Sequence, residues 1–143
     1  MTRGSPESLV RRFYAALNRR DLNAAFAMWD PKAVAYTPSS PEPKGKETFL
    51  SIGERFSKAF PDMKYKILGI MAKGGVVAIE GIATATFKGP LETPAGTVPP
   101  TGGHIEFGYA DFYRVNSRGM IAEYHTYYDT AGFNRQLRPP SRS

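Results

Sequence analysis

The chain has 143 residues, about the length of one domain, and 41% of them are hydrophobic, so it can bury a core of its own. It contains no cysteine, which excludes disulfides and thiol nucleophiles, and no apolar run approaches the roughly 18 residues of a membrane span. The N-terminus has no hydrophobic core of a signal peptide, so we expect a cytoplasmic protein that does not enter a membrane. The net charge of +6 comes from dispersed basic residues, so nucleic-acid binding is not expected.

The first sixty residues predict mainly helices. Ser5 and Pro6 form a typical helix start, with serine as the N-cap, and apolar residues then recur at helical spacing up to Leu17. Asp21 is expected to cap a second, shorter helix, and the Pro-rich segment TPSSPEPKGK is expected to be a loop. The predicted elements are helices over 6–17, 22–29 and 47–60 and a short strand over 33–37.

After Pro61 the periodicity changes from that of a helix to that of a strand. The turns AKGG and NSRG each join two strands, and a loop rich in Pro and Gly separates the two hairpins. The predicted strands are 63–71, 76–87, 104–115 and 120–128, and a closing helix is predicted over 130–137. This order predicts one α+β domain over 1–143, with a curved antiparallel sheet wrapped around the N-terminal helices. The ends, 1–4 and 139–143, are expected to be flexible.

One acid of the third long strand, Asp111, falls on an otherwise aromatic and apolar face. Pairing Val115 with Met120 across the NSRG turn puts Asp111 opposite Tyr124, and Tyr109 opposite Thr126, on that same face. Such a carboxylate is either structural, hydrogen-bonded to a tyrosine or the backbone, or a proton-transfer group. In the second case, desolvation raises its pKa toward neutrality.

Two other titratable residues near the C-terminus have structural interpretations. His125 falls on the charged, outward face of its strand, and Asp129 directly precedes the closing helix, where an aspartate accepts hydrogen bonds from free N–H groups. We expect Asp129 to be a helix cap and not a catalytic acid. The pairs His104-x-Glu106 and Glu123-x-His125 lack a third ligand, so no metal site is predicted.

Four segments carry a resemblance that covers essentially the whole chain: FYAALNRRDLNAAFAMW, GKETFLSIGERFSKAFPDM, VPPTGGHIEF and YYDTAGFNRQL. Together they resemble the SnoaL-like polyketide cyclase (ester cyclase) family, of the nuclear transport factor two-like superfamily. The resemblance implies a cone-shaped fold that encloses one deep apolar cavity, with dimerisation through the outer sheet. It also implies aldol ring closure on a polyketide ester without a metal or cofactor.

The family's catalytic histidine and aspartate are not retained here. The resemblance places the aspartate's position on Thr126 and the histidine's position near Asp111. Both positions lie on the inward face that the alternation predicts. The resemblance therefore supports the assignment of the two faces and leaves the acid/base residues of this chain to be identified from their surroundings.

We therefore predict a cofactor-independent acid/base enzyme that acts on a hydrophobic, polyketide-like small molecule by aldol cyclisation or a related proton transfer. Asp111 is the predicted general acid/base, and Tyr124 and Thr126 are predicted to donate hydrogen bonds to the developing oxyanion. The predicted pocket-lining residues are Tyr14, Trp29, Tyr36, Phe56, Tyr109 and Tyr128. The alternative is a non-catalytic small-molecule-binding or accessory domain on the same fold.

Overall fold

The computed structural model describes residues 4–139, so most of the two predicted flexible ends lies outside the described residues. The helices are α1 (Pro6–Asn18), α2 (Leu22–Phe26), α3 (Lys46–Ala59) and α4 (Thr130–Gln136). The strands are β1 (Trp29–Thr37), β2 (Ser40–Gly45), β3 (Lys64–Lys73), β4 (Val76–Thr86), β5 (Leu91–Thr93), β6 (Gly96–Val98), β7 (His104–Val115) and β8 (Ile121–Tyr128).

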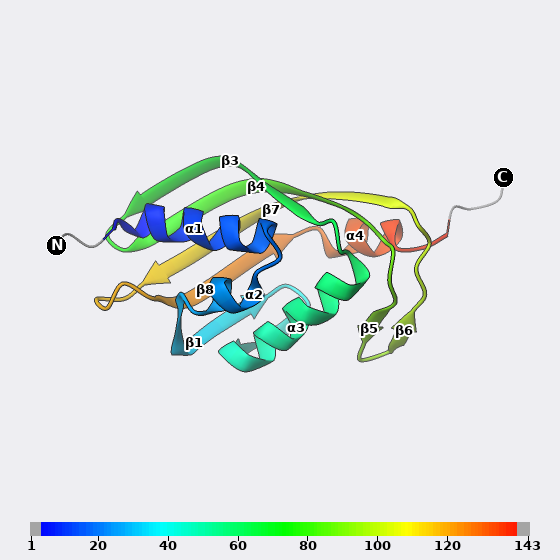
Figure 1. Ribbon diagram of the computed structural model, residues 1–143, viewed down its shortest axis with the longest axis horizontal. Helices are drawn as coiled ribbons and strands as arrows, with labels where there is room; N and C mark the ends of the chain where they lie inside the picture. Colours follow the sequence, from blue (N-terminus) through cyan, green and yellow to red (C-terminus); the bar gives the residue numbers. More distant parts are fainter. Residues whose placement is uncertain (1–3, 140–143) are drawn as a thin grey trace.

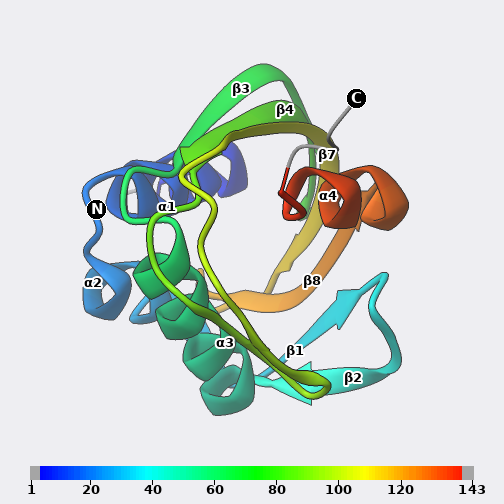
Figure 2. The ribbon, with the colours of Figure 1, turned by 90° about the vertical axis from the view of Figure 1, so that its right-hand side faces the viewer.

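The main sheet has six strands in the order β2-β1-β8-β7-β4-β3, and β5 and β6 form a separate hairpin. Its strands curl into an arc, and α1, α2 and α3 lie across the open side (Figure 2). The hairpin and α4 lie at one end of the molecule, which we call the α4 end, and the start of α1 lies at the other (Figure 1). The predicted curved sheet around N-terminal helices is confirmed, with one difference: β1 and β8 are parallel, so the sheet is mixed.

Local sequence signals account for the helix starts. The Ser5 side chain accepts a hydrogen bond from the backbone N–H of Ser8 at 3.1 Å, and Asp21 does the same for Ala24 at 3.0 Å. The second helix is shorter than predicted because it ends at Phe26, and Trp29 already begins β1. Within residues 4–139, no helix is long and apolar enough to cross a membrane.

Two predicted loops contain strands. The segment TPSSPEPKGK contains β2, an edge strand whose prolines are tolerated because one side of an edge strand needs no ladder hydrogen bonds. The Pro- and Gly-rich segment after β4 contains the β5–β6 hairpin, with Leu91 paired to Val98. Loops were predicted in both segments because they are rich in proline and glycine, which are typical of turns. Tertiary contacts form the strands there.

The register of β7 and β8 differs from the prediction by two residues. Asp111 lies opposite Thr126, and Tyr109 lies opposite Tyr128. An irregularity between Arg114 and Val115 shifts the pairing near the turn. Because a shift of two residues keeps every side chain on its original face, the predicted inward face of both strands is nevertheless correct.

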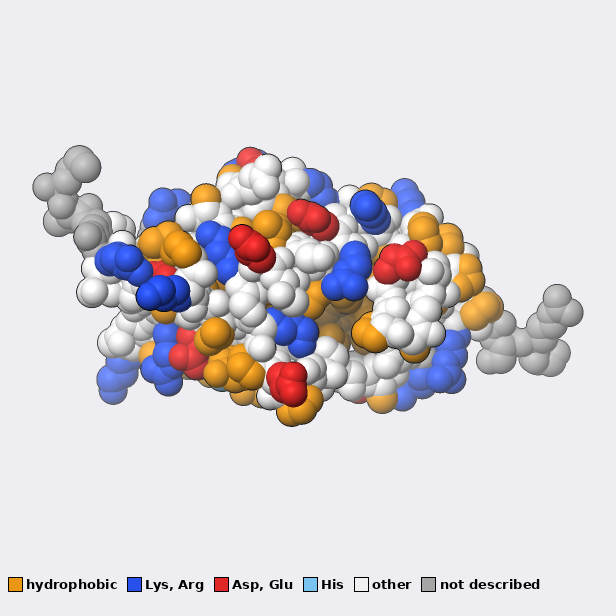
Figure 3. Space-filling view, turned by 90° about the horizontal axis from the view of Figure 1, so that it is seen from below, with side chains coloured by type: hydrophobic (Ala, Val, Ile, Leu, Met, Phe, Trp, Pro, Cys, Tyr) orange, Lys and Arg blue, Asp and Glu red, His pale blue; other side chains and the backbone are white. Residues whose placement is uncertain are grey.

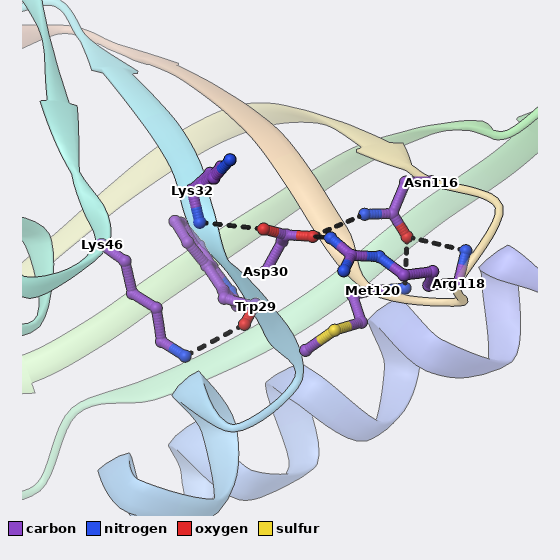
Figure 4. A network of polar contacts seen from close by, with 7 residues as sticks. All are labelled: Trp29, Asp30, Lys32, Lys46, Asn116, Arg118 and Met120. Atoms are coloured by element: carbon purple, nitrogen blue, oxygen red, sulfur yellow. Dashed lines mark hydrogen bonds and ion pairs between the residues drawn. The ribbon is translucent and has the colours of Figure 1, made fainter.

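An aspartate network fixes the β7–β8 turn to the start of β1, at the α1 end (Figure 4). The Asp30 carboxylate accepts hydrogen bonds from the Lys32 backbone N–H at 2.8 Å and from Asn116 Nδ2 at 2.9 Å, and it forms an ion pair with Arg118. The Lys32 N–H is the main reason that the pKa of Asp30 is lowered from its usual range. The sequence predicted only the end of a helix at this position.

Charged side chains are interspersed over the surface. In the face shown in Figure 3, Lys and Arg lie among Asp and Glu along the length of the molecule. This distribution agrees with the dispersed basic residues in the sequence.

Candidate functional site

Asp111 lies in the middle of β7, on the concave face of the sheet, and only 3% of its surface is exposed. The strand alternation that places it there also turns Tyr109 and Tyr113 inward. On the other side, α1 packs Tyr14 into the same space, because Tyr14 lies on the buried stripe of that amphipathic helix. The acid is therefore enclosed by aromatic side chains from both layers.

A chain of two tyrosine hydroxyl groups ends at one oxygen of the carboxylate. The Tyr14 hydroxyl donates a hydrogen bond to Asp111 Oδ2, and the Tyr113 hydroxyl donates one to the Tyr14 oxygen at 2.6 Å. This chain connects α1 to β7 across 97 residues of sequence. Each hydroxyl in it is oriented by the next, so the carboxylate is held in one position.

Three buried side-chain polar atoms have no hydrogen-bond partner within residues 4–139: Asp111 Oδ1, the Tyr109 hydroxyl and Trp29 Nε1. We call Asp111 Oδ1 the open oxygen and the Tyr109 hydroxyl the open hydroxyl. Leaving such a group unpaired costs about 1–3 kcal/mol, and most buried polar groups in native proteins are paired. Two of the three exceptions lie two residues apart on the same face of β7.

Burial raises the pKa of Asp111 from 3.8 to about 6, because the charged form loses solvation. The hydroxyl groups of Thr126, Tyr14 and Tyr124 lower this pKa, so burial prevails over them. Burial also raises the pKa of Tyr14 and Tyr124 well above 10, which keeps both phenols protonated. The site therefore combines one carboxyl group that titrates near neutrality with phenols that remain hydrogen-bond donors.

The position of Tyr109 depends on Gly81, its cross-strand partner on β4. The end of the Tyr109 ring lies so close to Gly81 that a Cβ there would collide with the phenol carbon and oxygen, and with the Lys66 carbonyl. The Tyr109 ring stacks on Tyr14 with centroids 6.2 Å apart and meets Tyr65 edge-on at 5.9 Å. The open hydroxyl is consequently fixed in the same aromatic space as Asp111.

The structure brings most of the predicted site residues together. Thr126 faces Asp111 across β7 and β8, and the Tyr124 ring lies 5.0 Å from that of Tyr113. Trp29 packs on the other side of Tyr124, with ring centroids 5.6 Å apart. Tyr113, which completes the hydroxyl chain, was absent from the predicted set although the alternation of β7 already placed it on the right face.

Tyr36 does not belong to this group. Its ring stacks on His125, 4.4 Å away and nearly parallel, on the outward face of the sheet. The predicted pocket-lining role of Tyr36 is therefore wrong. The reason is the parallel pairing of β1 with β8, which sets Tyr36 beside His125 and turns Ala35 inward beside Tyr124.

A second hydrophobic cluster closes the α4 end of the interior. Phe133 of α4 lies at its centre and contacts Phe56 of α3, with centroids 6.1 Å apart, and Phe107 of β7 at 5.2 Å. Tyr128 packs on both Phe107 and Phe133 and borders the two clusters. The predicted pocket residues Phe56 and Tyr128 thus lie between the α4 end and Asp111.

The side chain of Gln136 attaches α4 to the sheet. It accepts a hydrogen bond from the Glu106 N–H at 2.8 Å and donates one to the Glu106 carbonyl at 3.0 Å, as a neighbouring strand would. β8 ends its pairing with β7 at Tyr128, opposite Tyr109. Gln136 therefore continues the edge of β7 where the strand pairing stops.

Asp129 is the N-cap of α4, as predicted. Its Oδ1 accepts a hydrogen bond from the Gly132 N–H at 3.0 Å. We expect Asp129→Ala to lower the free energy of unfolding by about 1 kcal/mol, because the helix loses its cap, and to leave catalysis intact. Urea denaturation measures the loss, and Asp129→Asn, which retains a capping oxygen, is the control. Loss of turnover at unchanged stability would contradict the cap assignment.

The combination of a strongly bent sheet, a closing set of helices and an interior polar site defines the nuclear transport factor two-like class of α+β folds. The model of the SnoaL-like polyketide cyclase family matches residues 8–137. The chain belongs to this family. Among curated proteins, none matches it.

Several solved structures share the fold. AclR from Streptomyces galilaeus, a candidate hydroxylase, is 26% identical with a TM-score of 0.80, over 92% of this chain and 94% of AclR. IdmH from Streptomyces antibioticus, a candidate polyketide cyclase, is 27% identical with a TM-score of 0.77, over 94% of this chain and 99% of IdmH. A SnoaL-like protein from Jannaschia sp. CCS1 is 15% identical with a TM-score of 0.78, over 99% of both chains, and shows the fold alone.

Proposed function

We propose that the protein is an acid/base enzyme that needs no cofactor and in which Asp111 moves a proton of a hydrophobic carbonyl compound. The observation that carries the proposal is the enclosed carboxyl group, whose pKa is about 6 and whose open oxygen lacks a partner within the described chain. A base of this strength is suited to removing an activated α-proton near neutral pH. The hydroxyl groups of Tyr124 and Thr126 would donate to the enolate or alkoxide oxygen that forms.

The surroundings of Asp111 support an aromatic or polyketide-like substrate. Tyrosine, tryptophan and phenylalanine rings from α1, β1, β7 and β8 enclose the site, and the family resemblance points the same way. Ring closure by aldol condensation uses the base twice. Asp111 takes the α-proton, the resulting enolate carbon attacks a second carbonyl, and the protonated acid returns its proton to the new alkoxide.

Access to Asp111 requires an opening, because Tyr14, Tyr113 and Asp111 are all at least nine-tenths buried. At the α4 end, one side chain of α3, Phe56, meets one side chain of α4, Phe133. Because α4 has only seven residues, this contact is the part of the enclosure that we expect to open. A surface hollow of about 290 Å³ lies where the segment 98–101 meets the end of α4. We propose that substrates enter at the α4 end, through displacement of Phe133.

A second candidate function is ligand binding without turnover at the same site. The observation that favours it is that Tyr14, which itself accepts a hydrogen bond from Tyr113, already satisfies one oxygen of Asp111, as it would in a purely structural role. Turnover separates the two candidates. The test is conversion of a panel of aromatic polyketide methyl esters, followed by chromatography, with the wild type beside Asp111→Asn. If the wild type converts none of the panel, aldol cyclisation of this substrate class is excluded and ligand binding becomes the better candidate.

We also propose that two copies of the chain associate through the outward face of the sheet. Cross-strand partners form a continuous row over five strands on this face: Met71, Ala78, Phe112, His125 and Tyr36. Met71 is 75% exposed and Phe112 is 42% exposed, so two large apolar side chains of one row face solvent. A two-fold related copy can cover such a self-complementary row.

Phe112→Lys is expected to convert the dimer to a monomer, because it places a charge at the centre of this row. Light scattering coupled to size-exclusion chromatography measures the mass directly. Ser51→Lys, on the exposed side of α3, introduces the same charge away from the sheet and should leave the dimer intact. A monomeric wild type at micromolar concentration would contradict the proposal.

A further inference from the structure

Tyr113 is the far end of the hydroxyl chain that leads to Asp111. It lies two residues beyond Asp111 on β7, on the same inward face, and only 1% of its surface is exposed. Its ring packs against those of Phe13, Tyr14 and Tyr124, with centroids 5.9, 6.0 and 5.0 Å away. The proton transfer proposed for Asp111 does not use this residue, so its buried hydroxyl group has no role assigned so far.

The direction of the chain follows from the number of hydrogens in it. A carboxylate only accepts hydrogen bonds, so the single hydroxyl hydrogen of Tyr14 goes to Asp111 Oδ2. The single hydroxyl hydrogen of Tyr113 goes to the Tyr14 oxygen, 2.6 Å away. Burial raises the pKa of both phenols well above 10, so both hydrogens are kept near neutral pH. While Asp111 is ionised, the chain therefore runs from Tyr113 through Tyr14 to the carboxylate.

We propose that Tyr113 is a positioning residue that acts on Asp111 through Tyr14. Its hydrogen bond orients and polarises the Tyr14 hydroxyl group, which then donates more strongly to the ionised carboxylate. The inference rests on the proposed function, because it concerns the same carboxyl group. It adds a residue that sets, at one remove, how readily this group takes up a proton.

Other hydroxyl groups face Asp111, and their effects must be separated from that of Tyr113. The titratable and hydroxyl side chains around the carboxyl group are Tyr14 from α1, Tyr65 from β3, Tyr109 and Tyr113 from β7, and Tyr124 and Thr126 from β8. The neighbour on β4 is the apolar Ile79. Tyr65 is the useful comparison, because its ring lies 5.9 Å from that of Tyr14 and burial raises its pKa to about 12, yet it is not a member of the chain.

The ionisation of Asp111 in the free protein tests the inference without any turnover. Carbon-13 NMR follows the aspartate carboxyl groups from about pH 4 to about pH 9, and the Asp111 signal is the one that Asp111→Asn lacks. We expect Tyr14→Phe to raise the midpoint of this titration by about one pH unit, because the carboxylate loses a direct donor. Tyr113→Phe should raise it by about 0.3 pH unit, because only the polarisation of Tyr14 is lost.

The double variant separates action through Tyr14 from direct action. Once Tyr14 is replaced by phenylalanine, Tyr113→Phe should change the midpoint by less than about 0.1 pH unit. Tyr65→Phe is the matched control, and it should also leave the midpoint within about 0.1 pH unit of the wild type. Each change removes one oxygen and keeps the ring, so the packing is retained. An unmoved midpoint in Tyr113→Phe, an equal rise in both backgrounds, or the same rise in Tyr65→Phe would overturn the inference.

Turnover shows whether the inference or the proposed function has failed. In an active enzyme, Tyr113→Phe should move the fall of kcat/KM at low pH upward by the same amount as the NMR midpoint, which a loss of packing alone would not do. Turnover that depends on Asp111, with a midpoint that Tyr113→Phe leaves in place, would uphold the proposed function and remove the role of Tyr113. A midpoint that moves as expected in a protein that converts no substrate would uphold the role of Tyr113 and favour ligand binding over catalysis.

Discussion

Asp111→Asn is expected to lower kcat for the true substrate by about 100- to 10,000-fold, the usual contribution of a positioned general acid/base. Asparagine has nearly the same shape and can still accept the hydrogen bond of Tyr14, so the aromatic surroundings are retained. It cannot take up a proton at the open oxygen. The variant therefore removes the proton transfer and leaves the packing of the interior in place.

The pH dependence of wild-type turnover provides a second measurement of the same prediction. Because the base must be ionised in the free enzyme, kcat/KM should fall as the pH is lowered through about 6, the pKa of Asp111. Asp129→Ala is the matched control for Asp111→Asn, since it removes a carboxylate that the structure assigns to a helix cap. It should keep the turnover of the wild type. Equal kcat in Asp111→Asn and the wild type would remove Asp111 from the mechanism and leave the protein's acid/base group unassigned.

The same substitution is expected to change how stability depends on pH. Asp111 is almost fully buried, and its pKa is raised from 3.8 to about 6. Between these values the unfolded state has lost the proton and the folded state has kept it, so the free energy of unfolding falls as the pH rises through this window. A shift of roughly two pKa units corresponds to about 3 kcal/mol. The penalty is fully present above pH 6 and absent below pH 4.

Urea denaturation of the wild type and Asp111→Asn at a series of pH values measures this difference. The variant should gain about 3 kcal/mol relative to the wild type as the pH rises from about 4 to above 6. Asp30 and Asp62, whose lowered pKa values stabilise the fold as the pH rises, act equally in both proteins and cancel in the difference. A stability difference that is independent of pH would show that Asp111 titrates normally.

The faces of the strands were predictable from the sequence, but their register was not. Alternation with a period of two is a local property, so it assigned Asp111, Tyr124 and Thr126 to the interior correctly. The irregularity between Arg114 and Val115 depends on how β7 fits its neighbours, and the sequence of the NSRG turn does not reveal it. The prediction survived this error only because the shift was an even number of residues.

The contacts between the helices and the sheet could not be predicted from the sequence. The helical spacing of α1 placed Tyr14 on a buried stripe, but which inward residue it would meet depended on how α1 lies across the sheet. Tyr36 shows the opposite case. It was predicted to line the pocket, and the parallel pairing with β8 sets it beside His125 on the outward face.

The sequence by itself determined the helices, the long strands, the family resemblance and the inward position of one acid, because periodicity, capping residues and turns act over a few neighbouring residues. Only the tertiary structure decided which oxygen of Asp111 is occupied, where Tyr109 lies and how α4 closes the interior. Those features depend on side chains that are far apart in the chain and meet only when α1, α3 and α4 pack against the curved sheet.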